Sequence, residues 1–136
     1  MITEQEYVKR MLTMGGYTLV LCEGGRAFAS EEEGIRPLLD TVRSGEDWKN
    51  AYAALQTLGR AEALLLMHLK VGSVYAETAA KSALRLLERQ DIAYSYGACV
   101  PRLLNAEKTG LAEAEAAVRE IESPGEAVSA LEAIAK

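Results

Sequence analysis

The sequence predicts an α/β fold, a three-layer α-β-α sandwich around a small mixed sheet. Three observations support this: two strand-like segments around paired glycines, a strand–helix–strand pattern over residues 73–96, and a helical segment over residues 60–69 that is apolar almost all round. These patterns are typical of an antiparallel hairpin, a parallel strand pair with a crossover helix, and a helix buried between layers. The expected order of elements is α-β-β-α-α-β-α-β-α-α, with helices covering the sheet.

Length, composition and charge limit the class of protein. The chain has 136 residues, so we expect one domain over residues 1–136, with additional C-terminal helices from about residue 111. The net charge of −5 argues against bulk binding of nucleic acid or of anionic membranes, which normally need an excess of Lys and Arg. The sequence shows neither a signal peptide nor a membrane-spanning apolar run, which predicts a cytoplasmic protein with no membrane association.

Apolar periodicity and cap residues place the individual elements. Thr3-x-x-Glu6 is a capping-box pattern that starts a helix, and Gly15-Gly16 ends it. Gly24-Gly25 favours a hairpin turn over a phosphate-binding loop, because no helix directly follows. The expected helices are 3–16, 35–43, 47–70 with a break near Gly59, 80–87, 111–121 and 124–134, and the expected strands are 17–22, 26–30, 71–76 and 92–96.

The sequence contains no complete catalytic or metal-binding motif. One His and two Cys are too few for a structural zinc site, so we expect no metal and no cofactor. Phosphate loops, dinucleotide fingerprints and nucleophile elbows are also missing. We expect Cys22 and Cys99 to be small buried residues in a reducing compartment and His68 to be at least partly buried. A Cys/His pair with a third orienting group is the minor alternative.

Polar residues at the expected ends of elements form the candidate site. Ligands of α/β proteins gather beyond the carboxyl ends of strands, where helix N-termini present free N–H groups. Glu77 is expected just after a strand, and residues 105–110 form a polar loop before a helix. Helix caps, turns and surface charges are the simpler interpretation, which we favour for each residue. The candidates are Arg60, Glu77, Lys81, Asn105, Thr109, Gly110 and Glu115.

Four stretches occur in an order that resembles a known family: Ile35-Arg-Pro-Leu-Leu39, Gly59-Arg60-Ala61, Val74-Tyr-Ala-Glu77, and Asn105-x-x-x-Thr109-Gly110-Leu111-x-x-x-Glu115. The resemblance is to a small bacterial and archaeal family of unknown function. That family is similar in fold to cytidine deaminases but lacks their zinc ligands. The resemblance covers roughly residues 17–118 and implies a cytidine deaminase-like fold.

The chain departs from the family's pattern at several polar positions. Where the family has Asp-Lys before Gly-Lys-Ala, this chain has Leu55-Gln56 before Gly59-Arg60-Ala61. Ala112 and Glu113 stand where the family has Cys-Pro. The resemblance therefore implies a divergent member, without any activity that depends on that Asp, Lys or Cys.

These observations favour binding over catalysis. We expect a non-catalytic domain that binds a small ligand, such as a nucleotide, or a protein partner. The predicted binding residues are Arg60, Glu77, Asn105, Thr109, Gly110 and Glu115. One alternative is a metal-independent enzyme with Glu77 or Glu115 as general base. The other is a structural module, whose alanine-rich helices over residues 112–117 and 127–135 form a homodimer face.

Overall fold

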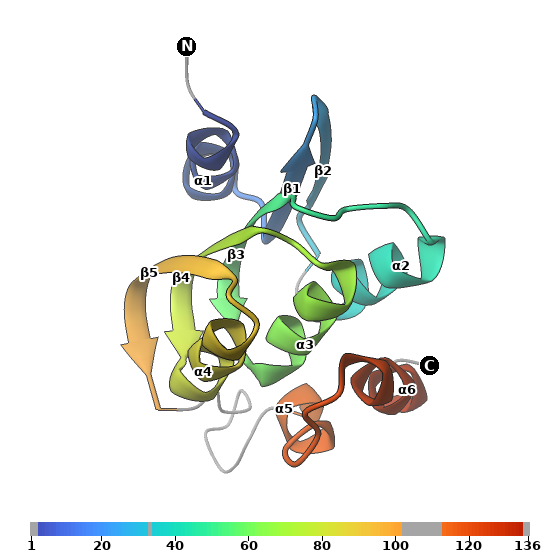
Figure 1. The fold of residues 1–136 in the computed structure, drawn as a ribbon. Coiled ribbons are helices and arrows are strands. Elements are labelled where there is room, and N and C mark those ends of the chain that lie inside the picture. The colour runs from blue at the N-terminus through green and yellow to red at the C-terminus, as the bar shows by residue number, and fades with distance from the viewer. Residues whose placement is uncertain (1–2, 33, 102–112, 135–136) are drawn as a thin grey trace.

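The computed structural model describes residues 3–32, 34–101 and 113–134, which form an α/β fold around one five-stranded sheet (Figure 1). The strands lie in the order β2-β1-β3-β4-β5. β1 pairs antiparallel with both β2 and β3, whereas β3–β4 and β4–β5 are parallel, so the predicted mixed sheet is confirmed. The elements are α1 (Glu4–Gly15), β1 (Leu19–Glu23), β2 (Arg26–Ser30), α2 (Arg36–Ser44), β3 (Tyr52–Leu58), α3 (Arg60–Leu69), β4 (Ser73–Ala80), α4 (Lys81–Arg89), β5 (Ala93–Val100), α5 (Glu113–Ala117) and α6 (Pro124–Ile134).

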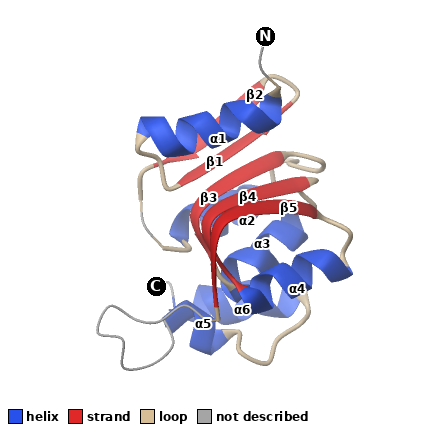
Figure 2. Ribbon diagram, turned by 90° about the vertical axis from the view of Figure 1, so that its left-hand side faces the viewer, coloured by secondary structure: helices blue, strands red, loops and turns tan. Residues whose placement is uncertain are grey.

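Helices cover the two faces of the sheet unequally (Figure 2). α1 packs on one face against β1 and β3, with Val8 and Leu12 buried against Val20 and Ala54. The other face carries α3 and α4, with α2 packed beside α3, and α5 and α6 pack against α3. The main hydrophobic core lies on this second face. α1 reaches as far as Tyr75 of β4, and the part of this face formed by β5 carries no described helix.

The N-terminal elements form where their local signals predict. Thr3 caps α1, since its Oγ1 accepts a hydrogen bond from the backbone N–H of Glu6 at 3.1 Å. Gly24 and Gly25 have φ values of 57° and 86°, the left-handed conformation that a two-residue hairpin turn requires. The predicted first helix and hairpin are therefore confirmed.

The region 47–70 differs from the sequence prediction. Its first half is not helical: Tyr52–Leu58 forms the central strand β3, and Gly59 is the N-cap of α3. Alanine and leucine gave this segment helical character, but it is hydrogen-bonded to β1 on one side and β4 on the other. Tertiary pairing on both edges overrides a weak local propensity. The sheet therefore has five described strands instead of the four expected.

The strands β4 and β5 are longer than predicted. The parallel β4–α4–β5 unit is confirmed, with Val74 opposite Tyr94 in register. β4 continues to Ala80, so Glu77 lies inside the strand and not after it, as the sequence suggested. Gly97 of β5 lies close to β4, because a Cβ there would be only 2.9 Å from the carbonyl oxygen of Glu77.

Three side chains test the expectations about buried residues. Cys22 is buried, and burial together with Glu4, whose carboxylate accepts a hydrogen bond from the thiol, raises the pKa of Cys22 to about 11. The predictions for Cys99 and His68 were wrong, because both are exposed. Cys99 lies on an edge strand, and His68 is a solvent-facing position of an otherwise buried helix.

Candidate functional site

Two of the predicted site residues, Arg60 and Glu115, meet at the N-terminus of α3. Glu115 of α5 is only 7% exposed. Its two carboxylate oxygens accept hydrogen bonds from the backbone N–H groups of Arg60 and Ala61, each at 2.9 Å. A carboxylate is favourable here because the first N–H groups of a helix lack partners and the helix dipole is positive at this end. Glu115 therefore acts as a helix cap supplied by a distant segment.

The side chain of Arg60 makes the reciprocal contact. Its Nε donates to the carbonyl of Val118 at 3.0 Å, and its Nη2 donates to the carbonyl of Ile121. These carbonyls belong to the connection between α5 and α6. Arg60 and Glu115 thus join α3 to the C-terminal helices, which is the helix-cap interpretation that the sequence left open.

A third charged group, Glu62, lies beside this contact. Its Oε1 accepts a hydrogen bond from the backbone N–H of Gly59 at 3.0 Å, which is the half of a capping box that the N3 glutamate supplies. Burial of the carboxyl group, reinforced by the nearby Glu115, raises the pKa of Glu62 to about 7. Glu62 was not predicted from the sequence, because Gly59 has no side-chain oxygen that could accept a hydrogen bond at the N-cap and so mark the start of the helix.

The remaining predicted residues are not brought to this contact. Glu77 is partly buried within β4, two residues after Tyr75, which packs against the α1 cluster. Because side chains two apart in a strand share a face, Glu77 lies on the α1 face, opposite α3. Lys81 is exposed at the start of α4. Asn105, Thr109 and Gly110 lie outside the described residues.

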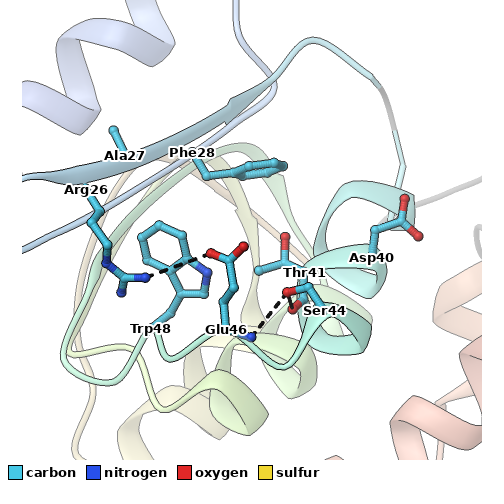
Figure 3. A pocket seen from close by; sticks show the side chains of 8 residues that line it. All are labelled: Arg26, Ala27, Phe28, Asp40, Thr41, Ser44, Glu46 and Trp48. Atoms are coloured by element: carbon cyan, nitrogen blue, oxygen red, sulfur yellow. Dashed lines mark hydrogen bonds and ion pairs between the residues drawn. The ribbon is translucent and has the colours of Figure 1, made fainter.

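A cavity of about 470 Å³ lies elsewhere, between the hairpin, α2 and the loop that follows α2 (Figure 3). Phe28 projects from β2 above Trp48 of the loop, and Glu46 lies beside Trp48 on the side of Thr41 and Ser44. Trp48 is 4% exposed and belongs to the main core, so it forms a fixed wall. The lining residues are Arg26, Ala27, Phe28, Asp40, Thr41, Ser44, Glu46 and Trp48.

Arg26 organises one side of this cavity. Its guanidinium carbon lies 4.3 Å from the centroid of the Trp48 ring, within cation–π range. Its Nη1 is 3.9 Å from the Glu46 carboxylate, and its Nη2 is 3.1 Å from that of Glu23. The same Nη2 donates to the carbonyl of Asp47, which holds the loop against the hairpin.

The hydroxyl groups of the cavity are already engaged within the protein. Thr41 Oγ1 donates to the carbonyl of Pro37 at 2.8 Å. Ser44 Oγ donates to the carbonyl of Thr41 at 2.7 Å and accepts from the backbone N–H of Glu46. The carboxylates of Asp40 and Glu46 are 58% and 59% exposed as side chains. Each carboxylate also forms an ion pair at 3.9 Å, Glu46 with Arg26 and Asp40 with Arg43, and their exposure leaves acceptor oxygens that a bound molecule could reach.

This cavity was not predicted from the sequence, although its two aromatic residues are conspicuous there. Phe28 and Trp48 are the single Phe and the single Trp of the chain. They are separated by the whole of α2, so only the packing of the hairpin against α2 and its following loop brings them together.

A second cavity, of about 380 Å³, lies where β3, β4 and β5 begin. Its wall includes Asn50, Lys70 and Asp91, which have φ values of 66°, 60° and 56°. Lys70 is the C-cap of α3, where left-handed backbone is common. The lining carries both signs of charge, with Lys49 and Lys70 beside Asp91. It therefore indicates neither an anionic nor a cationic ligand.

The described residues contain neither a cluster suited to a metal ion nor a helix suited to a membrane. No group of three or more His, Cys, Asp or Glu side chains in residues 3–32, 34–101 and 113–134 is arranged to hold a metal ion. Over the same part of the chain, no helix combines the length and apolar character needed to cross a bilayer.

Comparison with known proteins gives one family and one fold. The family model TM1506, described as domain of unknown function DUF1893, matches residues 7–134. The solved structure of a DUF1893 family protein (TM1506) from Thermotoga maritima superimposes with a TM-score of 0.88 at 19% identity. The alignment covers 96% of this chain and 89% of that one, so the fold is shared along nearly the whole length. No curated protein matches this sequence.

Proposed function

Because the chain belongs to the TM1506 family, DUF1893, whose function is not known, we propose a role from its geometry: a cytidine deaminase-like domain that binds a small ligand and does not act as a catalyst. The sheet order supports the deaminase-like scaffold, since a hairpin is followed by alternating helices and strands, as the resemblance implies. The departures at Leu55, Gln56 and Ala112 support a divergent member that has lost polar groups. The ligand site is the cavity at Phe28 and Trp48.

The lining of the cavity indicates the chemical class of the ligand. Phe28 offers an aromatic face above the fixed wall of Trp48, which suits a flat ring. Asp40 and Glu46 accept hydrogen bonds and outnumber Arg26, the one cation among the described lining residues, so the cavity favours amino groups over phosphate. We therefore propose an amino-substituted heterocycle, such as a nucleobase or nucleoside. The single observation that carries this proposal is the presence of both aromatic residues and both carboxylates in one cavity.

A thermal-shift screen followed by calorimetry tests the proposal. Nucleobases and nucleosides are expected to raise Tm, because a ligand at about 100 times its Kd stabilises the folded state by about 2.7 kcal/mol. The corresponding nucleotides are expected to raise Tm less, because the carboxylates of the cavity repel phosphate. Glu46→Gln and Asp40→Asn are each expected to weaken binding roughly tenfold, since a hydrogen bond to a charged group is worth about 1.5–3 kcal/mol.

Glu126→Gln is the matched control, because Glu126 is an exposed carboxylate on α6, away from this cavity. No Tm shift with any base or nucleoside at millimolar concentration would refute the proposal. Equal loss of affinity in the control variant would show that the effect is only one of net charge. The stretch 105–110 stays a predicted binding segment. The affinity of Thr109→Ala should therefore be measured with the same ligands.

A metal-independent enzyme is the second candidate, favoured by the pKa of Glu62. A carboxyl group with a pKa of about 7 can give or take a proton at neutral pH. The sequence suggested Glu77 or Glu115 as the base. Glu115 is held by two backbone N–H groups and suits a structural role better, and Glu77 lies within β4, away from this contact. If a substrate is found, loss of turnover in a Glu62→Gln variant that remains folded, as judged by circular dichroism, would support catalysis. Unchanged turnover would exclude Glu62 as the base.

A further inference from the structure

The outer edge of β5 is open in the described structure. β5 is the last strand of the sheet, and no described strand pairs with its other side. Six of its eight residues are exposed, and Tyr96, at 44%, is one of the few large hydrophobic residues on the surface. An open edge presents a row of unpaired N–H and C=O groups that can pair with another chain.

β5 also lacks the features that usually protect such an edge. No charged residue and no proline occur from Ile92 to Val100. Natural monomers commonly block exposed edges with lysine, proline, bulges or very short strands. The one glycine, Gly97, is explained by its close approach to the Glu77 carbonyl and not by edge protection. The edge is long, uncharged and fully extended, which favours strand addition.

We propose that β5 pairs antiparallel with β5 of a second copy of this chain, so that two five-stranded sheets join across a two-fold axis. Such an interface uses the same surface on both copies. The residue at the axis lies opposite its own copy, and its neighbours lie opposite nearby residues of the same strand, so any charge close to the axis would come near a like charge. β5 has no charged residue. Self-pairing requires this absence of charge, whereas pairing with a peptide of opposite charge would not require it.

The side chains of β5 match this symmetry. Tyr94 and Tyr96 stack with ring centroids 6.4 Å apart, and they lie on the face that carries α4. Directly opposed residues in an antiparallel pair share a face, so an axis that passes between one residue of β5 and its own copy places the tyrosines of both strands in one row. Cross-strand aromatic pairs of this kind stabilise antiparallel sheets.

Sedimentation velocity across a series from micromolar to millimolar concentration tests the proposal on the full chain. Wild type is expected to reach twice the protomer mass of 14.7 kDa. Tyr96→Lys and Ala98→Asp are expected to remain monomeric, because each places like charges near the axis. Met14→Lys is the matched control: Met14 is 83% exposed, on α1 and away from β5, and should leave the dimer intact.

Hydrogen exchange locates the contact and covers the case of a variant that fails to fold. In wild type, the amides of β5 should exchange more slowly as concentration rises, whereas those of β2, at the other edge, should not change. A wild-type monomer throughout the series would overturn the proposal. A dimer that persists in both folded β5 variants, or protection confined to β2, would overturn it as well.

Discussion

The N-terminus of α3 gathers three charged side chains whose roles are set by their immediate contacts. Glu115 is held by two backbone N–H groups, and Arg60 returns the contact to the α5–α6 connection. Glu62 has one backbone partner, lies beside a second carboxylate and has a raised pKa. The two carboxyl groups thus differ in their surroundings, although they lie in one site.

The raised pKa of Glu62 predicts a specific dependence of stability on pH. A carboxyl group whose pKa is higher in the folded state binds protons more readily when folded. The free energy of unfolding should therefore fall as pH rises from about 4.5 to about 7, by at most about 3 kcal/mol from this group. Urea unfolding of wild type and Glu62→Gln at pH 4.5 and pH 7.5 measures this difference.

Glu62→Gln should gain stability relative to wild type as pH increases, because the amide cannot ionise. Glu120→Gln, at an exposed position, is the control and should follow wild type at both values. Parallel pH profiles for wild type and Glu62→Gln would contradict the assignment.

At the scale of elements, short-range signals and sheet pairing contribute in different ways. The hairpin is specified locally, because Gly24 and Gly25 adopt backbone conformations that few other residues favour. β3 is specified by its neighbours, since its alanine-rich sequence acquires strand geometry between β1 and β4. The same pairing that makes β3 central leaves β5 at the edge.

The local origin of the hairpin can be tested by substitution. Gly24→Ala and Gly25→Ala should each lower the free energy of unfolding by about 1–2 kcal/mol, because an L-residue is strained at φ values of 57° and 86°. Urea denaturation provides the measurement. Gly125→Ala is the control, because Gly125 is exposed and its nearest neighbour, Ser123 Oγ, is 4.0 Å from the added Cβ. Equal costs at all three positions would refute the local explanation.

At the scale of the whole molecule, the C-terminal helices are part of the core. Val118, Ala127 and Leu131 are completely buried and belong to the same cluster as α3. The alanine-rich stripe expected to form a dimer face is therefore used within the chain. The Arg60–Glu115 contact ties these helices to α3 at its N-terminal end.

This arrangement predicts that the C-terminal helices and the rest of the described structure unfold together in one cooperative transition. Leu131→Ala should lower the free energy of unfolding by about 2–5 kcal/mol, because it leaves a cavity in the core. Circular dichroism and tryptophan fluorescence at Trp48 should report the same transition, although Trp48 is on a distant loop. Ile134→Ala, at a position that is 36% exposed, should cost much less. An early transition seen by circular dichroism alone would show that α6 unfolds separately.

The sequence by itself determined the features that depend on nearby residues: the capped first helix, the glycine hairpin, the proline-started helices and the parallel β4–α4–β5 unit. It also pointed to Arg60 and Glu115, because charged residues beside helix ends are visible as a local pattern. Only the tertiary structure decided that Tyr52–Leu58 is a strand and that Glu115 caps the N-terminus of α3 at Arg60. It also decided that Phe28 and Trp48 share a cavity with Asp40 and Glu46. These outcomes depend on which distant segments become neighbours, and that is set by packing the whole chain around one core.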